Sequence, residues 1–141
     1  KDSKKQAQGI SFSHDGEIFH YYEGNPILDI WSTEFRDPTV FWYEPTQRWV
    51  MVVAKALEKK IKFYTSPDLK EWTWMSDFGP AGDNEKSWEC PDLFQLPVDG
   101  SSKEKKWVMV VSVNWAREQY FIGDFDGVSF KLIDLCMWTK D

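Results

Sequence analysis

Two short segments of the sequence carry residue types that could do acid–base chemistry. Arg36-Asp37-Pro38 and Glu89-Cys90-Pro91 each place a carboxylate close to a proline. Two carboxylates on one rigid frame suit glycoside hydrolysis, because one carboxyl group donates a proton while another stays ionised. The plainer interpretation is that each acid solvates a turn, since Asp before Pro is common in turns. The two segments by themselves leave both interpretations open.

These two segments occupy equivalent places in an internal repeat. The run Trp49–Val53 recurs as Trp107–Val111, an offset of 58, and Pro38 corresponds to Pro91, an offset of 53. A longer turn around residues 97–106 absorbs the difference. The alignment sets Asp37 opposite Cys90 and Glu89 opposite Arg36, at the same level of two successive modules. We therefore expect the two acids to face one shared, water-filled cavity.

The elements that must position these residues read as strands. Short apolar runs are bounded by turn signals, and helical periodicity is nearly absent. Asp15-Gly16 predicts a hairpin turn between residues 10–13 and 17–22. Residues 61–65 alternate like a half-buried strand, whereas residues 54–60 are too few for a credible helix. About four strands in roughly 50 residues is the period of a β-propeller blade.

The repeat predicts an all-β protein, part of a β-propeller with about two and a half blades of four-stranded antiparallel sheets. We expect residues 1–30 to end one blade, residues 31–80 to form a full blade and residues 81–141 to form a further one. Because a propeller closes with at least four blades, we expect the chain to be a fragment. The alternative is a single β-sandwich in which the repeated segments arise by chance.

Composition excludes several classes of protein. The 141 residues include 17 Lys and Arg against 23 Asp and Glu, a net charge of −6 that does not suit a nucleic-acid binder. A hydrophobic content of 42% is too high for a disordered acidic tail. The longest uncharged apolar run, residues 107–116, is about half of a bilayer span. Cys90 and Cys136 give neither a metal spacing nor a disulfide framework, so we expect no metal, no cofactor and no membrane partner.

The chain is rich in aromatic residues, which make up 17% of the sequence and include 9 Trp. Flat rings near predicted strand ends or loops could stack on sugars, and four tryptophans have such positions: Trp31, Trp42, Trp88 and Trp115. Packing between blades accounts for most of them. Trp88, beside Glu89, is the strongest candidate for a substrate contact. Cys90 also reads as a buried small hydrophobe at a strand start.

Both segments also resemble a known family. Phe35-Arg36-Asp37-Pro38, followed by Val40-Phe41-Trp42, resembles the Arg-Asp-Pro motif of glycoside hydrolase family 32. The stretch Trp88-Glu89-Cys90-Pro91-Asp92-Leu93 resembles that family's Glu-Cys motif. The resemblance runs from Gly9 to Phe130 and is strongest to bacterial levanases and exo-inulinases. It is supported by three further stretches, residues 24–28, 63–72 and 120–127.

The resemblance implies a five-bladed propeller and retaining hydrolysis of β-fructofuranosidic bonds in levan, inulin or sucrose. Glu89 would be the general acid/base, and Asp37 would stabilise the transition state through fructose hydroxyls. Arg36 would orient a carboxylate or bind a sugar hydroxyl, and Trp88 and Cys90 would contact substrate. A parent protein of this kind is expected to be secreted or periplasmic. The oligomeric state is not readable.

One departure from the family pattern bears on activity. The family's nucleophile is an Asp in a Trp-Met-Asn-Asp-Pro-Asn-Gly stretch, which does not occur among the 141 residues. We therefore expect the isolated chain to be inactive. A non-catalytic carbohydrate-binding propeller is the alternative from another class, and a protein-interaction propeller is a weaker one.

Overall fold

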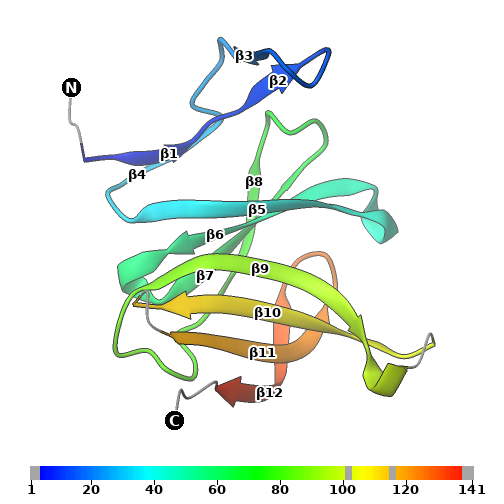
Figure 1. Ribbon diagram of the computed structural model, residues 1–141. Coiled ribbons are helices and arrows are strands. Elements are labelled where there is room, and N and C mark those ends of the chain that lie inside the picture. The colour runs from blue at the N-terminus through cyan, green and yellow to red at the C-terminus, as the bar shows by residue number, and fades with distance from the viewer. Residues whose placement is uncertain (1–3, 101–102, 115–116, 138–141) are drawn as a thin grey trace.

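The protein is built from strands joined by short turns (Figure 1). The computed structural model describes residues 4–100, 103–114 and 117–137, without the side chains of residues 135–137. The strands are β1 (Gln6–Gln8), β2 (Ser11–Ser13), β3 (Phe19–Tyr21), β4 (Leu28–Ser32), β5 (Phe35–Tyr43), β6 (Arg48–Lys55), β7 (Lys60–Ser66), β8 (Thr73–Phe78), β9 (Trp88–Pro97), β10 (Lys105–Val113), β11 (Arg117–Phe125) and β12 (Phe130–Met137). The predicted all-β class is confirmed.

The helical content of the described residues is limited to three 3-10 turns: Glu44–Thr46, Ala56–Glu58 and Val98–Gly100. The second of these lies in residues 54–60, where the sequence predicted no credible helix, and it links β6 to β7. Within the same ranges no helix is long and apolar enough to cross a membrane.

The strands form two four-stranded antiparallel meanders and two smaller pairs. One sheet has the order β5-β6-β7-β8, the next has the order β12-β11-β10-β9, and β1 pairs with β4 while β2 pairs with β3. Neighbours in sequence are therefore neighbours in each large sheet. The strand β4 runs to Ser32, two residues past the blade boundary expected at residue 30. Figure 1 shows the β1–β4 region, the first large sheet and the second large sheet following one another in space.

The main hydrophobic core lies between the two large sheets. Val50, Val52 and Phe63 on one side meet Met109 and Phe121 on the other. Phe63 stacks on Phe125 across the interface with ring centroids 5.5 Å apart. Aromatic packing between sheets was the expected use of most rings and supplies a large buried area per residue.

The first large sheet is covered on both faces. Met51 and Val53 alternate with Val50 and Val52 along β6 and enter a second core with Phe35, on the side of Leu28 and Ile30 from β4. A strand buried on both faces reads as an unbroken apolar run, which explains the six consecutive apolar residues from Trp49 to Ala54.

The same turn closes three of the hairpins. Asp15, Asp68 and Asp126 each accept two backbone N–H groups from the residues that follow, through one carboxylate oxygen. In the first two turns, the serine two positions earlier also accepts backbone N–H groups. Asp15 belongs to the predicted turn at residues 15–16, and its pKa is lowered to about 2 by the N–H groups of Ile18 and Glu17. These local bonds set where β3, β8 and β12 begin.

Candidate active site

The strands β5 and β9 begin with the same irregular backbone. Register passes from Arg36 opposite Ala54 directly to Thr39 opposite Val52, and β9 has the equivalent break between Glu89 and Asp92. Within each break one residue has a positive φ, 59° at Asp37 and 48° at Cys90, and each is followed by proline. Both are β-bulges, which re-aim side chains at the start of a strand. The predicted equivalence of Asp37 with Cys90 holds in the backbone.

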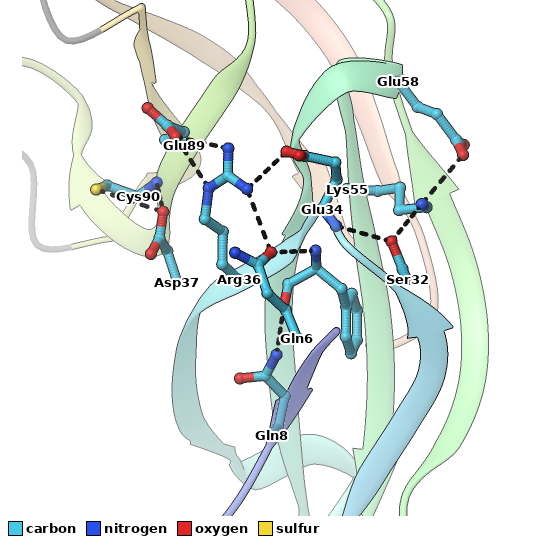
Figure 2. A network of polar contacts seen from close by, with 11 residues as sticks. Gln6, Gln8, Ser32, Glu34, Arg36, Asp37, Lys55, Glu58, Glu89 and Cys90 are labelled. Carbon is cyan, nitrogen blue, oxygen red and sulfur yellow. Dashed lines mark hydrogen bonds and ion pairs between the residues drawn. The ribbon is translucent and has the colours of Figure 1, made fainter. Parts of the chain in front are cut away.

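The two bulges bring Arg36 and Glu89 together. The Arg36 Nε and Nη2 atoms lie 2.9 and 2.8 Å from the same Glu89 oxygen, Oε1 (Figure 2). Glu89 is only 6% exposed, so the pair is largely withdrawn from solvent. Truncating one partner of a buried pair leaves an uncompensated charge, and the arrangement therefore holds both side chains in place.

A further set of groups holds the other side of the Arg36 guanidinium. Its Nη1 donates to Glu34 Oε2 at 2.6 Å and to Gln6 Oε1 at 3.2 Å. The same Gln6 oxygen accepts the Phe35 N–H at 2.8 Å, while Gln8 donates to the Phe35 carbonyl at 2.9 Å. The two glutamines of β1 therefore clamp the first residue of β5. The burial of Arg36 opposes its charged form, but hydrogen bonds to Glu34 and Glu89 raise its pKa.

Asp37 and Cys90 form a second contact between the two bulges. The Cys90 backbone N–H donates to Asp37 Oδ2 at 3.1 Å, and the Cys90 Sγ lies 3.8 Å from the same oxygen. Thr39 Oγ1, two residues after Asp37, donates to the carbonyl of Pro91, the residue after Cys90, at 2.8 Å. Cys90 is exposed, contrary to the expectation of a buried hydrophobe. Partial desolvation of the thiol and the nearby Asp37 carboxylate raise its pKa.

The sequence predicted that the side chain of Trp88 contacts substrate, and the structure contradicts this prediction. Its exposure is 0%, and its ring packs 5.6 Å from Phe121 and 6.3 Å from Phe78, measured between centroids. Its Nε1–H donates to the Asp83 carbonyl at 2.7 Å. Because the ring is enclosed in the core, it cannot stack on a sugar; it anchors the start of β9 instead.

Two of the other three tryptophans expected near strand ends are exposed: Trp31 at 74% and Trp42 at 42%. Trp115 lies outside the described residues. His14 and His20, which flank the predicted hairpin turn, are exposed at the surface. Trp31, Trp42, His14 and His20 make no hydrogen bond or ring contact with Arg36 or Glu89 among the described residues.

Neither Arg36 nor Glu89 lines a cavity of about 1100 Å³ on the second large sheet. It is lined by β10 and β11, including Val108, Val110 and Ile122, and by none of the five residues expected at the site. Val108 and Val110 repeat Val50 and Val52, which are fully buried between the sheets. The cavity therefore lies on a packing face of the second sheet, and the shared cavity expected for the acids is not found there.

The site shows no metal centre in the described ranges, where no group of three or more His, Cys, Asp or Glu side chains could hold an ion. Sequence reasoning missed Gln6, Gln8 and Glu34. Two signals pointed to them: glutamines two apart on a short strand share one face, and Glu34 lies two residues before Arg36.

A comparison with protein families decides the assignment. The model of the "Glycosyl hydrolases family 32 N-terminal domain" matches residues 1–138, nearly the whole chain. The chain belongs to glycosyl hydrolase family 32. The resemblance read from the Arg36 and Glu89 segments is confirmed at the level of the family.

Individual relatives of this family 32 chain agree. It is 49% identical over 135 residues to the levanase of Bacillus subtilis, covering 89% of this chain and 20% of that protein. It is 44% identical over 132 residues to the extracellular exo-inulinase of Meyerozyma guilliermondii, covering 89% of this chain and 25% of that protein. The fructofuranosidase of Schwanniomyces occidentalis, solved with fructose, superposes with a TM-score of 0.88 at 40% identity, covering 96% of this chain and 28% of that one.

The superposition confirms the predicted fold, part of a β-propeller built from four-stranded antiparallel sheets. The chain spans between a fifth and about 28% of these relatives.

Proposed function

We propose that the protein containing this chain hydrolyses β-fructofuranosidic bonds in levan, inulin or sucrose with retention of configuration. Its relatives include a levanase and an exo-inulinase, and the solved fructofuranosidase holds fructose. The observation that carries the proposal is the placement of Glu89, a nearly buried carboxyl group with one oxygen held by Arg36. Position and protonation are the two properties that a general acid requires.

Glu89 is the general acid/base in this proposal. Its carboxyl proton passes to the oxygen of the leaving sugar as the glycosidic bond breaks, and the resulting carboxylate later accepts a proton from the attacking water. A retaining reaction passes through a glycosyl-enzyme, and its nucleophile stretch is not among these 141 residues. For that reason we infer that the 141 residues alone release no fructose.

Asp37 is the transition-state stabiliser, through hydrogen bonds to fructose hydroxyls. One of its oxygens, Oδ2, accepts the Cys90 N–H, so the side chain is held, while Oδ1 has no hydrogen-bond partner among the described residues. Cys90 contributes an exposed thiol at the same level and lies at the edge of the site. A carboxylate fixed by a neighbouring backbone lowers the entropy cost of orienting a sugar.

Arg36 orients Glu89 in this proposal rather than binding a sugar hydroxyl. All three of its guanidinium nitrogens already contact protein acceptors, Glu89, Glu34 and Gln6. Trp88 is left out of the substrate contacts because its ring is buried. We also propose the blade division at residues 1–30, 31–80 and 81–141, and secretion, which the extracellular exo-inulinase supports.

The test is to assay the full-length protein with sucrose, levan and inulin, before and after Glu89→Gln. Glutamine keeps the shape and can still accept from Arg36, but it has no acidic proton. Removing general acid–base catalysis lowers kcat by about 10² to 10⁴, so fructose release should fall by that factor. The matched control is Glu85→Gln, an exposed acid four positions earlier on the preceding loop, which should retain full activity.

Near-normal turnover by Glu89→Gln, with an unchanged unfolding transition, would remove Glu89 from the acid/base role. A protein that binds fructans in calorimetry but releases no fructose in either form would support the carbohydrate-binding alternative. A protein that neither binds nor hydrolyses fructans would contradict both.

A further inference from the structure

We propose that Glu34 and Gln6 are positioning residues that act through Arg36 to set the pH at which Glu89 gives up its proton. The inference rests on the proposed function, because it makes these two residues determine the alkaline limit of the reaction. Neither belongs to the two motifs, and neither contacts Glu89 directly in the structure. Their influence passes through the guanidinium that they share with it (Figure 2).

The geometry divides the Arg36 guanidinium between two carboxylates. Nε and Nη2 face Glu89, and Nη1 faces Glu34 and Gln6. Side-chain exposures are 25% for Arg36, 27% for Glu34 and 8% for Glu89. One cation therefore serves one nearly buried and one partly buried anion, and a change at either anion alters what the cation offers the other.

The same contacts indicate which Glu89 oxygen carries the proton. A guanidinium donates hydrogen bonds and cannot accept them, so the oxygen that Arg36 contacts, Oε1, must face it as an acceptor. The proton of the acid form therefore resides on Oε2. Glu34 and Gln6 keep the guanidinium in this orientation, because losing them would free Nη1 and let the group rotate about its long side chain.

Among the described residues, the other charged groups near Glu89 do not contact the Arg36 guanidinium, so they do not take the place of Glu34. Asp37 on β5 contacts the Cys90 backbone instead of Arg36, and Glu118 on β11 acts on the Cys90 thiol. Lys55 on β6 lies close to Glu34 in Figure 2, but its Nζ contacts Ser32 at 2.6 Å and Glu58 at 3.4 Å. The cation that Glu34 contacts is Arg36.

Two isosteric substitutions of opposite sign test the inference. Glu34→Gln removes a negative charge, so Arg36 gives more of its charge to Glu89 and the ionised form of Glu89 is favoured. The alkaline limb of the kcat/KM profile should move to lower pH by roughly half a unit or more. Gln6→Glu keeps the acceptor oxygen and adds a negative charge, so the same limb should move to higher pH.

The profiles are measured on the full-length protein with sucrose, with Glu58→Gln as the matched control. Glu58 is a half-exposed acid that pairs with Lys55 and Lys60 and does not touch Arg36, so its removal should leave the limb in place. At one pH unit above the wild-type limb, the kcat/KM of Glu34→Gln, taken as a fraction of its own plateau, should be about threefold lower than the same fraction for the wild type. A purely structural role would lower the plateau of both variants without moving the limbs in opposite directions.

A second measurement separates this inference from the proposed function. The side-chain carboxyl carbon of Glu89 is followed by NMR against pH in the unsubstituted protein, Glu34→Gln and Gln6→Glu. Midpoints that move down and up respectively support the inference, even if no fructose is released and the proposed function fails. Midpoints that stay together, or move in the same direction, overturn it, even in a fully active enzyme.

Discussion

The strands β5 and β9 begin in the same way, yet one brings a cation and the other a carboxylate to the same point. Each opens with a fully buried aromatic residue, Phe35 or Trp88, and each has a positive φ two residues later. Because the backbones match, residues between these landmarks take matching places, and Arg36 meets Glu89 across the two sheets. Two strands with the same backbone can therefore form a polar site when the side chains at their equivalent positions differ, here Arg36 on β5 and Glu89 on β9.

The two strand starts are also held by different means. Phe35 is clamped through its backbone, whose N–H and C=O bond the side chains of Gln6 and Gln8 from β1. Trp88 is clamped through its side chain, whose indole N–H reaches the Asp83 carbonyl. The Asp83 backbone is in turn held by both polar atoms of the Gln119 side chain. The β5 bulge therefore depends on the preceding sheet, whereas the β9 bulge depends on its own.

The largest effect should come from Trp88→Ala, which tests whether the aromatic anchors are equivalent. Removing a fully buried ring costs about 3 to 5 kcal/mol, and the Asp83 carbonyl also loses one of its two donors and keeps Gln119. The free energy of unfolding in urea should fall by that amount, and Phe35→Ala should give a loss of the same class. Trp88→Phe should keep most of the packing and lose only about 1 kcal/mol with the hydrogen bond.

Sugar affinity provides the opposing outcome for Trp88. A Trp88→Phe protein that unfolds normally but no longer binds fructose in calorimetry would show that the ring contacts substrate. Phe35 and Trp88 would then not be equivalent core anchors.

A smaller effect should distinguish the two residues with positive φ. Asp and Asn tolerate the left-handed region, whereas a β-branched residue is strained there. Cys90→Val should therefore destabilise the protein by about 1 to 2 kcal/mol relative to Cys90→Ala, because both residues carry the Cβ that the left-handed region disfavours and only Val adds two γ carbons that crowd the backbone. Cys90→Asn should be close to neutral, as Asp37 is at the equivalent position. Equal stabilities for the Val and Asn variants in urea would contradict a strained bulge.

The smallest effect concerns the contact between Asp37 and Cys90, which can be followed through the reactivity of the Cys90 thiol. Its pKa is raised by partial desolvation and by the Asp37 carboxylate, so at mildly alkaline pH it holds less of the reactive thiolate than an ordinary cysteine. Asp37→Asn removes the anion and lowers that pKa. Alkylation of Cys90 by iodoacetamide at pH 8, located by mass spectrometry, should speed up by about two- to fivefold.

Asp92→Asn is the control for the thiol measurement, since it removes an exposed acid two residues from Cys90 on the same strand. It should leave the alkylation rate unchanged. Equal acceleration by both variants would mean that the rate reflects the overall negative charge instead of the Asp37 contact.

Much of the fold was predictable because its determinants are local. Strand alternation, the turn at residues 15–16 and the repeated apolar run at residues 49 and 107 depend on neighbours in sequence. The repeat also aligned Asp37 with Cys90 before their φ angles were known. The exposure of Trp88 was not predictable, because a ring at a strand start faces the core or the solvent according to which way the bulge turns.

The sequence by itself determined the strand class, the module length and the two segments that would meet, since hydrophobic period and turn chemistry are written along the chain. Only the tertiary structure decided how those segments are held. Gln6 meets Arg36, 30 residues further along, because β1 lies beside the start of β5, and Arg36 meets Glu89, 53 residues further along, because two sheets stack. Such contacts depend on the direction in which each side chain leaves the backbone, and packing sets that direction between elements that sequence spacing does not relate.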